Sequence, residues 1–194
     1  MKMFQPLLFS AAAAFVLVAC TTSPKVAVNT APAVVAPAPT VVMGATSGAF
    51  TAVDRDFALT AASANMLEIG ASRMAPRRAG DADVLAYANT LNQHHTMAMN
   101  ELAAIMSARG VAVPTQLPQG MQPIMNRLGT TTSGEFDRYF ISDVGIDAHT
   151  AAINQFQQRM PALSDPDLKA WAAKTLPTLQ QHLQMAQQIA NRIG

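Results

Sequence analysis

Four long stretches of this sequence carry apolar or small side chains at every third or fourth position, which is the period of an amphipathic helix. Half of the chain is apolar and only 6% is aromatic, and few segments show the alternation of a half-buried strand. Each amphipathic helix has to bury one face, so the pattern predicts an all-α fold, an antiparallel four-helix bundle. The stretches cover, in chain order, about residues 51–75, 81–110, 132–160 and 164–193.

Capping residues mark where these helices begin. Thr51 is followed three residues later by Asp54, and Thr132 by Glu135, which is the spacing of a capping box. A long connection over residues 110–134 contains several prolines and glycines, and we expect one short helix within it. The four N-cap residues that we predict are Thr51, Asp81, Thr132 and Ser164.

The first 19 residues have the features of a secretory signal peptide: a positive charge at Lys2, an apolar segment and small residues before Cys20. Residues 17–20, Leu-Val-Ala-Cys, resemble the bacterial lipobox, in which the cysteine is lipidated and becomes the first residue of the mature chain. Residues 20–49 hold four prolines among small and β-branched residues, a composition typical of an extended tether. The helical domain is expected to cover residues 50–194.

A lipid anchor at Cys20 predicts attachment to a membrane, and the alternative is an ordinary signal peptide with a chance cysteine. Thr21 rather than aspartate follows the cysteine, which in double-membraned bacteria favours sorting to the outer membrane, facing the periplasm. The leader holds Lys2 alone of the 13 basic residues, which leaves 12 against 12 acidic residues. This charge balance, together with the lack of a basic run, argues against nucleic acid as a partner. No feature of the sequence identifies a protein partner.

One side chain that is able to bind a metal lies near the middle of each predicted apolar face. Burying a carboxylate without a partner is expensive, and imidazole and carboxylate are ordinary ligands of transition metals. The pattern predicts one bound ion of zinc, iron or copper in the interior. The alternative is a buried hydrogen-bond network without a metal. The candidate ligands, one from each helix, are Glu68, His95, His149 and His182.

Three further residues are expected to support the ligands. Asp143 and Asp147 lie on the neighbouring face of the third predicted helix, where a carboxylate is able to accept the N–H of a ligand imidazole. His94 adjoins His95 on the flank of the second predicted helix. Counting 1.5 Å per residue from the helix ends spreads the candidate ligands over roughly 9 Å, with His182 furthest from the others.

From residue 57 onward, the chain also resembles the family catalogued as domain of unknown function 4142, whose members are labelled ferritin-like and predicted outer-membrane proteins. The resemblance implies a ferritin-like bundle in the cell envelope, and it does not imply an activity. Members usually have Asp-His where this chain has His94-His95. The residues that carry the resemblance are Glu68, His95, Phe136-Asp137, Tyr139, His149, Leu176-Pro177 and His182.

The ligand set favours a mononuclear site over a di-iron cluster. Di-iron bundles use four carboxylates and two Glu-x-x-His motifs, and this sequence has no such motif. We therefore interpret the chain as an envelope lipoprotein that binds one metal ion for sequestration, sensing or stress protection. The alternative is a structural or interaction lipoprotein with a buried polar network. An oxidase is a third interpretation, but no second carboxylate pair supports it, so no catalytic residue is assigned.

Overall fold

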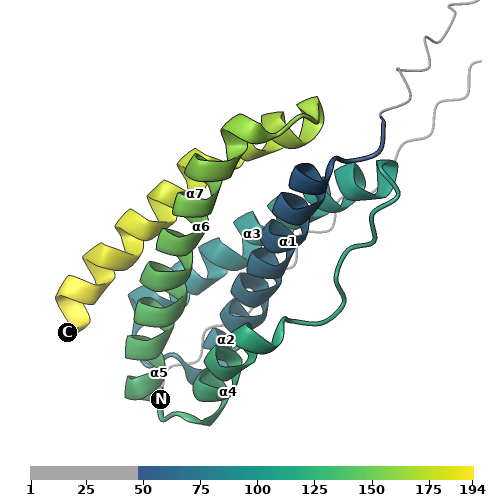
Figure 1. The fold of residues 1–194 in the computed structure, drawn as a ribbon. Helices are drawn as coiled ribbons and strands as arrows, with labels where there is room; N and C mark the ends of the chain where they lie inside the picture. Colours follow the sequence, from purple (N-terminus) through teal and green to yellow (C-terminus); the bar gives the residue numbers. More distant parts are fainter. Residues whose placement is uncertain (1–47) are drawn as a thin grey trace, which may run out of the picture. The chain divides into compact units, whose positions relative to one another are not determined.

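The computed structural model describes residues 48–194, and every regular element in that range is helical (Figure 1). The all-α prediction is therefore confirmed for the described residues. The predicted signal peptide, Cys20 and the tether up to residue 47 lie outside them. In the described part of the chain, no helix combines the length and the apolar content that crossing a membrane requires.

The first helices begin and end at the predicted signals. The side chains of Thr51 and Asp54 form the expected capping box at the start of α1. The Asp81 carboxylate accepts backbone N–H groups at the start of α3. Gly110 follows the end of α3 with a φ of 69°, a left-handed conformation that glycine adopts without strain. The bounds are α1 Ala52–Ser72, α2 Ala75–Arg78 and α3 Ala82–Ala108.

The second half of the chain agrees with the prediction in outline and differs at one cap. The backbone N–H and the hydroxyl of Thr132 both donate to the Glu135 carboxylate, as expected. The predicted cap at Ser164 is wrong, because Asp165 caps the last helix and accepts the N–H of Leu168 at 2.8 Å. The bounds are η1 Gln119–Met121, α4 Gln122–Thr130, α5 Ser133–Tyr139, η2 Phe140–Ala148, α6 His149–Arg159, η3 Met160–Ala162 and α7 Pro166–Ile193.

The third predicted helix contains a π-helical segment that the sequence pattern did not indicate. Segment η2 is nine residues of π-helix between α5 and α6. A π-helix is wider than an α-helix and occurs mostly as a single turn, often at functional sites. The segment contains Gly145, where an added Cβ would lie 2.7 Å from the Cβ of Ala186 and 3.3 Å from the Tyr87 ring. The absence of a side chain at this glycine therefore lets η2 lie close against α7.

The helices enclose two apolar clusters. Helix α7 packs against α3, η2 and α6, while α1 packs mainly against α3, and Figure 1 shows α6 and α7 side by side. The Trp171 cluster contains Phe57, Phe156 and Trp171, with ring centroids of Phe57 and Phe156 5.0 Å apart. The Tyr87 cluster contains Tyr87 and Phe140, whose ring centroids lie 6.2 Å apart.

Candidate metal centre

A layer of buried polar side chains separates the two clusters. Along α3, residues 84–91 belong to the Tyr87 cluster and residues 98–106 to the Trp171 cluster, and His95 lies between them. The same division holds on the other three long helical segments. We call the four polar residues at the division the histidine layer: Glu68, His95, His149 and His182, all of them buried.

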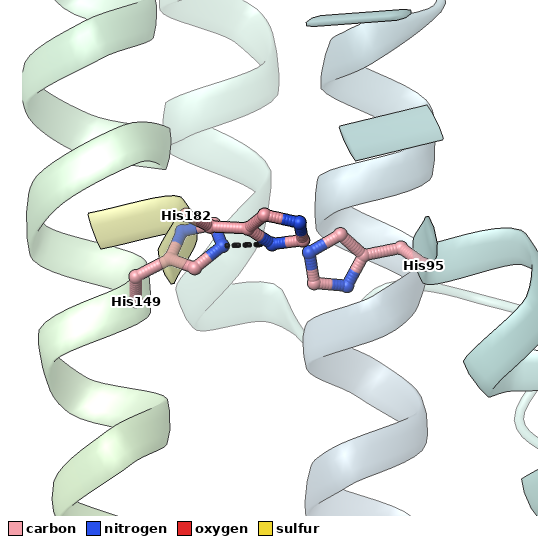
Figure 2. Close-up of side chains that lie close together, drawn as sticks. All are labelled: His95, His149 and His182. Carbon is pink, nitrogen blue, oxygen red and sulfur yellow. Dashed lines mark hydrogen bonds between the residues drawn. The ribbon is translucent and has the colours of Figure 1, made fainter. Parts of the chain in front are cut away.

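The three histidines of the layer meet. Figure 2 shows His95 from α3, His149 from α6 and His182 from α7 with their rings turned toward one another. Their ring centroids lie 5.2 to 5.4 Å apart, and one nitrogen from each ring lies within 4.8 Å of the others. His182 contacts both other rings, so its predicted displacement along the helix axis is wrong. Counting from helix ends ignores the stagger between neighbouring helices, which brings His182 level with the others.

Burial makes all three imidazoles neutral at neutral pH. Desolvation is the largest cause in each case, and it lowers the pKa of His149 to about 4 and the pKa of His182 to about 3. Desolvation also lowers the pKa of His95 well below its ordinary value, and the neighbouring His149 and His182 add to that shift. Neutral imidazole is the form that binds a metal, so ion binding does not have to compete with a bound extra proton.

The hydrogen bonds of His149 fix the positions of the ring protons. His149 Nδ1 lies 2.9 Å from the carbonyl oxygen of Val144, which only accepts, so Nδ1 carries the proton and Nε2 carries a lone pair. This lone pair accepts a hydrogen bond from Nδ1 of His182 at 3.2 Å. The lone pair of His182 is therefore on Nε2, where it accepts from Nδ1 of His94 at 2.8 Å.

His95 presents a lone pair that no described residue satisfies. Its Nδ1 lies 3.0 Å from Oδ1 of Asn65, and the Asn65 amide is oriented by a bond from its Nδ2 to the carbonyl of Ala61. His95 Nδ1 therefore donates, and the lone pair is on Nε2. His95 Nε2 is buried and has no hydrogen-bond partner among the described residues. A buried, unpaired acceptor lowers stability by roughly 1–3 kcal/mol, so it calls for a functional explanation.

Glu68 lies in the layer but outside the group of converging nitrogens. Its Oε1 is 3.5 Å from Nδ1 of His149, on the side of that ring facing away from His182, and its Oε2 has no partner among the described residues. Burial raises the pKa of Glu68 well above its ordinary value. His149 is neutral at pH 7, so the contact is not an ion pair. The structure thus places Glu68 behind His149, where it is able to orient that ring.

The three predicted supporting residues have different outcomes. His94 contacts His182, a neighbour that the sequence did not indicate, and its ring stacks on that of His182 with centroids 5.1 Å apart. Asp143 instead accepts hydrogen bonds from Arg127 and from Ser142. Asp147 is exposed. The expected carboxylate partner of His149 is therefore replaced by a backbone carbonyl, because the π-helical segment brings Val144 within reach of the ring.

Sequence reasoning missed two partners in this centre. Asn65 precedes Glu68 by three residues, so helical spacing places both on one face of α1, and this signal was available. The carbonyl of Val144 has no such signal, because a backbone acceptor is chosen by local geometry rather than by residue type.

The arrangement is close to what a tetrahedral ion requires. Two imidazole nitrogens bound at about 2.05 Å to one tetrahedral ion lie about 3.4 Å apart. Since one nitrogen of each ring already lies within 4.8 Å of the others, these three atoms have to close by no more than about 1.4 Å. Both nitrogens of His182 are in hydrogen bonds, so binding an ion has to break one of them.

Comparison with known proteins adds a family and a fold. The sequence matches the family described as Domain of unknown function (DUF4142) over residues 40–189. No curated protein matches it significantly. The fold is similar to that in the crystal structure of a DUF305 fragment from Deinococcus radiodurans, with a TM-score of 0.66 and 12% sequence identity. The similarity covers 74% of this chain and 99% of that fragment, and at this identity it shows a shared fold alone.

Proposed function

The chain belongs to the DUF4142 family, and because that description names no activity, we propose from the site alone that the protein binds one transition-metal ion. The ligands are His95, His149 and His182. The observation that carries the proposal is the convergence of three neutral imidazoles, one of which has a buried and unpaired lone pair. A bound cation supplies the partner that His95 Nε2 lacks.

The chemistry of the donors narrows the choice of ion. Three neutral imidazoles suit zinc, copper or iron, and they are a poor site for calcium or magnesium, which prefer oxygen ligands. Three protein ligands leave one coordination position open on a tetrahedral ion. Glu68 lies 3.5 Å from Nδ1 of His149, in the place of the carboxylate of a carboxylate–histidine–metal arrangement, and would offset part of the ion's charge once ion binding displaces its proton.

The proposed setting of this site is the bacterial cell envelope. We place it in a ferritin-like, antiparallel four-helix bundle over residues 50–194, joined by the tether to a lipid on Cys20 and held at the outer membrane facing the periplasm. The fold shared with the DUF305 fragment is compatible with the bundle, and the lipobox resemblance supports the anchor. The role that we propose is sequestration, sensing or stress protection.

A second function is favoured by the hydrogen bonds within the layer. The chain of contacts from His149 through His182 to His94 satisfies most ring nitrogens without an ion. On this alternative the layer is a structural polar network that fixes the register of the helices, and the protein is an interaction module of the envelope. The unpaired His95 Nε2 and Glu68 Oε2 weigh against it, since a network built for structure leaves few members unsatisfied.

Metal content and thermal unfolding separate the two functions. We expect the purified full chain, reconstituted with Zn²⁺ or Cu²⁺, to hold about one equivalent and to unfold at a higher temperature than a chelator-treated sample. His149→Ala should abolish both effects. Gln93→Ala, an exposed polar position on the same helix as His95, is the matched control and should keep both. If the reconstituted wild type holds no ion, the structural network is the correct function.

A further inference from the structure

His94 lies between the histidine layer and the surface of the protein. The three candidate ligands are buried, whereas His94 is half-buried and stacks on His182 with an interplanar angle of 17°. The outer face of His94 lines a surface hollow of about 240 Å³ between α3 and α7. The hollow is therefore separated from the candidate ligand His182 by one imidazole ring.

The hydrogen bond between His94 and His182 fixes which nitrogen of His94 carries a free lone pair. Its Nδ1 donates to Nε2 of His182 at 2.8 Å, so in the neutral ring the lone pair is on Nε2. This Nε2 makes no hydrogen bond to any described residue, and it is not among the buried unpaired atoms. An imidazole lone pair is thus available to a ligand in the hollow.

A thioether lines the same hollow as this lone pair. Met97 follows His94 by three residues, so both side chains lie on the same face of α3, and both line the hollow. Met97 is 49% exposed, which makes it unusual among the large apolar side chains of the described chain. It does not serve as core filling there. Thioether sulfur is a soft donor that prefers Cu(I) and similar cations.

Charges at the far end of the hollow leave it close to neutral. The Glu101 carboxylate lies in the hollow, but Nζ of Lys174 contacts both of its oxygens, at 2.7 and 2.9 Å. A bare acidic cluster would attract hard divalent cations by charge alone. Among the side chains that line the hollow, the imidazole and the thioether are the donors that soft cations prefer, so the chemistry of these donors selects the ion.

We propose that His94 and Met97 form a loading site, at which a soft monovalent cation of the Cu(I) class binds before it passes to the buried histidines. This inference rests on the proposed metal centre for its destination. The ion binds Met97 Sδ and His94 Nε2 at the surface. Turning of the His94 ring then breaks its bond to His182 and frees the Nε2 lone pair of His182 as the next ligand. The transfer is an exchange of neutral ligands on one ion, with no change in its charge.

The molecule offers a matched control. Met99 is a methionine on the same helix, but it lines a different hollow, with Met66, Thr96 and Asn100 and without a histidine. A general affinity of methionine for soft ions would act at both positions. A loading site requires the effect at Met97 alone.

Silver(I) is a suitable probe because it is soft and monovalent and does not change oxidation state. We would titrate the full chain, labelled with ¹³C at its methionine methyl groups, with Ag(I) and record its methyl and imidazole NMR signals. In spectra recorded over time after each addition, the Met97 methyl signal should shift first and the signals of the buried imidazoles later, and the Met99 signal should remain in place. Met97→Leu should slow the appearance of the bound-imidazole signals about tenfold with the same end point, and Met99→Leu should not.

Two further variants separate the loading site from the buried centre. His149→Ala removes a buried ligand, so the imidazole response should disappear while the Met97 shift persists, and this result would show that ion binding at the surface does not depend on the buried centre. His94→Phe keeps a stacked ring and removes both nitrogens, so it should weaken the Met97 shift. An Ag(I) titration that leaves the Met97 signal unmoved, or moves Met97 and Met99 alike, overturns the loading site whatever the buried histidines do.

Discussion

The two apolar clusters and the histidine layer between them are built from the same helices, yet their side chains are satisfied in opposite ways. In the Trp171 cluster the rings of Phe57, Phe156 and Trp171 pack with centroids 5.0 to 6.4 Å apart. In the layer, His95 Nε2 and Glu68 Oε2 are buried without partners among the described residues. Packing in the clusters therefore stabilises the fold, whereas the unpaired buried atoms of the layer lower its stability.

This difference shows where the sequence favours function over stability. Apolar residues of similar size in the layer would join the two clusters into one continuous core, and such replacements of buried charged or polar groups are often stabilising. A protein that keeps four titratable groups at this level holds a less stable interior than the same helices permit. Unsatisfied polar groups of this kind are expected at functional sites rather than in purely structural cores.

The largest expected effect is the loss of a ring from the Trp171 cluster. Phe57 is fully buried and contacts Phe156 and Trp171, so Phe57→Ala should lower the free energy of unfolding by about 3–5 kcal/mol through lost burial and the cavity left behind. Denaturant titration measures the change. At a temperature where the variant is folded, metal stoichiometry should equal that of the wild type. A loss of metal from the folded variant would mean that cluster and layer are not separable.

The contact between η2 and α7 gives the next largest effect. Gly145→Ala places a Cβ 2.7 Å from that of Ala186, so the helices have to move apart, and we expect a loss of roughly 1–3 kcal/mol in unfolding free energy. Gly129→Ala is the matched control, because no atom lies within 4 Å of its added Cβ and it also lies in a helix. That change should be neutral or stabilising. Equal losses in both variants would show that backbone effects, rather than the close approach, decide the result.

The same comparison explains what sequence patterns predict in this molecule. Helices, their caps at Thr51 and Asp81 and the inward direction of His95 follow from local spacing, because each depends on residues within a few turns. The meeting of His95 with His182 depends on how two helices are staggered, and residue counts from helix ends misplaced His182. The π-helical segment and the carbonyl of Val144 depend on packing against α7, which local periodicity does not report.

The layer should also give the protein an unusual dependence of stability on pH in the presence of a chelator. The folded-state pKa values of His149 and His182, about 4 and about 3, lie below the ordinary 6.5. Stability is therefore complete above pH 6.5 for these groups and falls as the pH falls toward 4, since the unfolded chain takes up protons first. Glu68 acts in the opposite direction, because its raised pKa keeps it protonated in the folded state while the unfolded chain ionises above its ordinary value of 4.5.

Three histidines against one carboxyl give a net rise in stability up to about pH 6.5, where the histidine effect is complete, and Glu68 alone opposes it by about 1.4 kcal/mol per pH unit until the pH passes its raised folded-state pKa. Unfolding free energies between pH 5 and 8.5 test the curve. Glu68→Gln keeps a neutral group of similar shape and should remove the opposing effect of Glu68 while leaving the fall in stability at acid pH. An unchanged curve in this variant would show that Glu68 is ionised in the folded protein.

The smallest expected effect is the most direct test of the contrast between cluster and layer. His95→Leu removes the unpaired Nε2 and extends the apolar face of α3 between the two clusters, but it leaves Oδ1 of Asn65 without its donor. The variant removes one buried unpaired acceptor and creates another, so the two effects largely cancel. The free energy of unfolding should therefore rise by no more than about 1 kcal/mol. His95→Leu combined with Asn65→Leu removes both polar groups and should be more stable than either single variant.

Metal content and chemical denaturation, measured on the same samples, connect the two properties: stability should rise in the double variant as metal binding disappears. If the double variant is instead less stable than the wild type in the presence of a chelator, the layer contributes to folding through its hydrogen bonds, and the contrast drawn between the two regions is wrong.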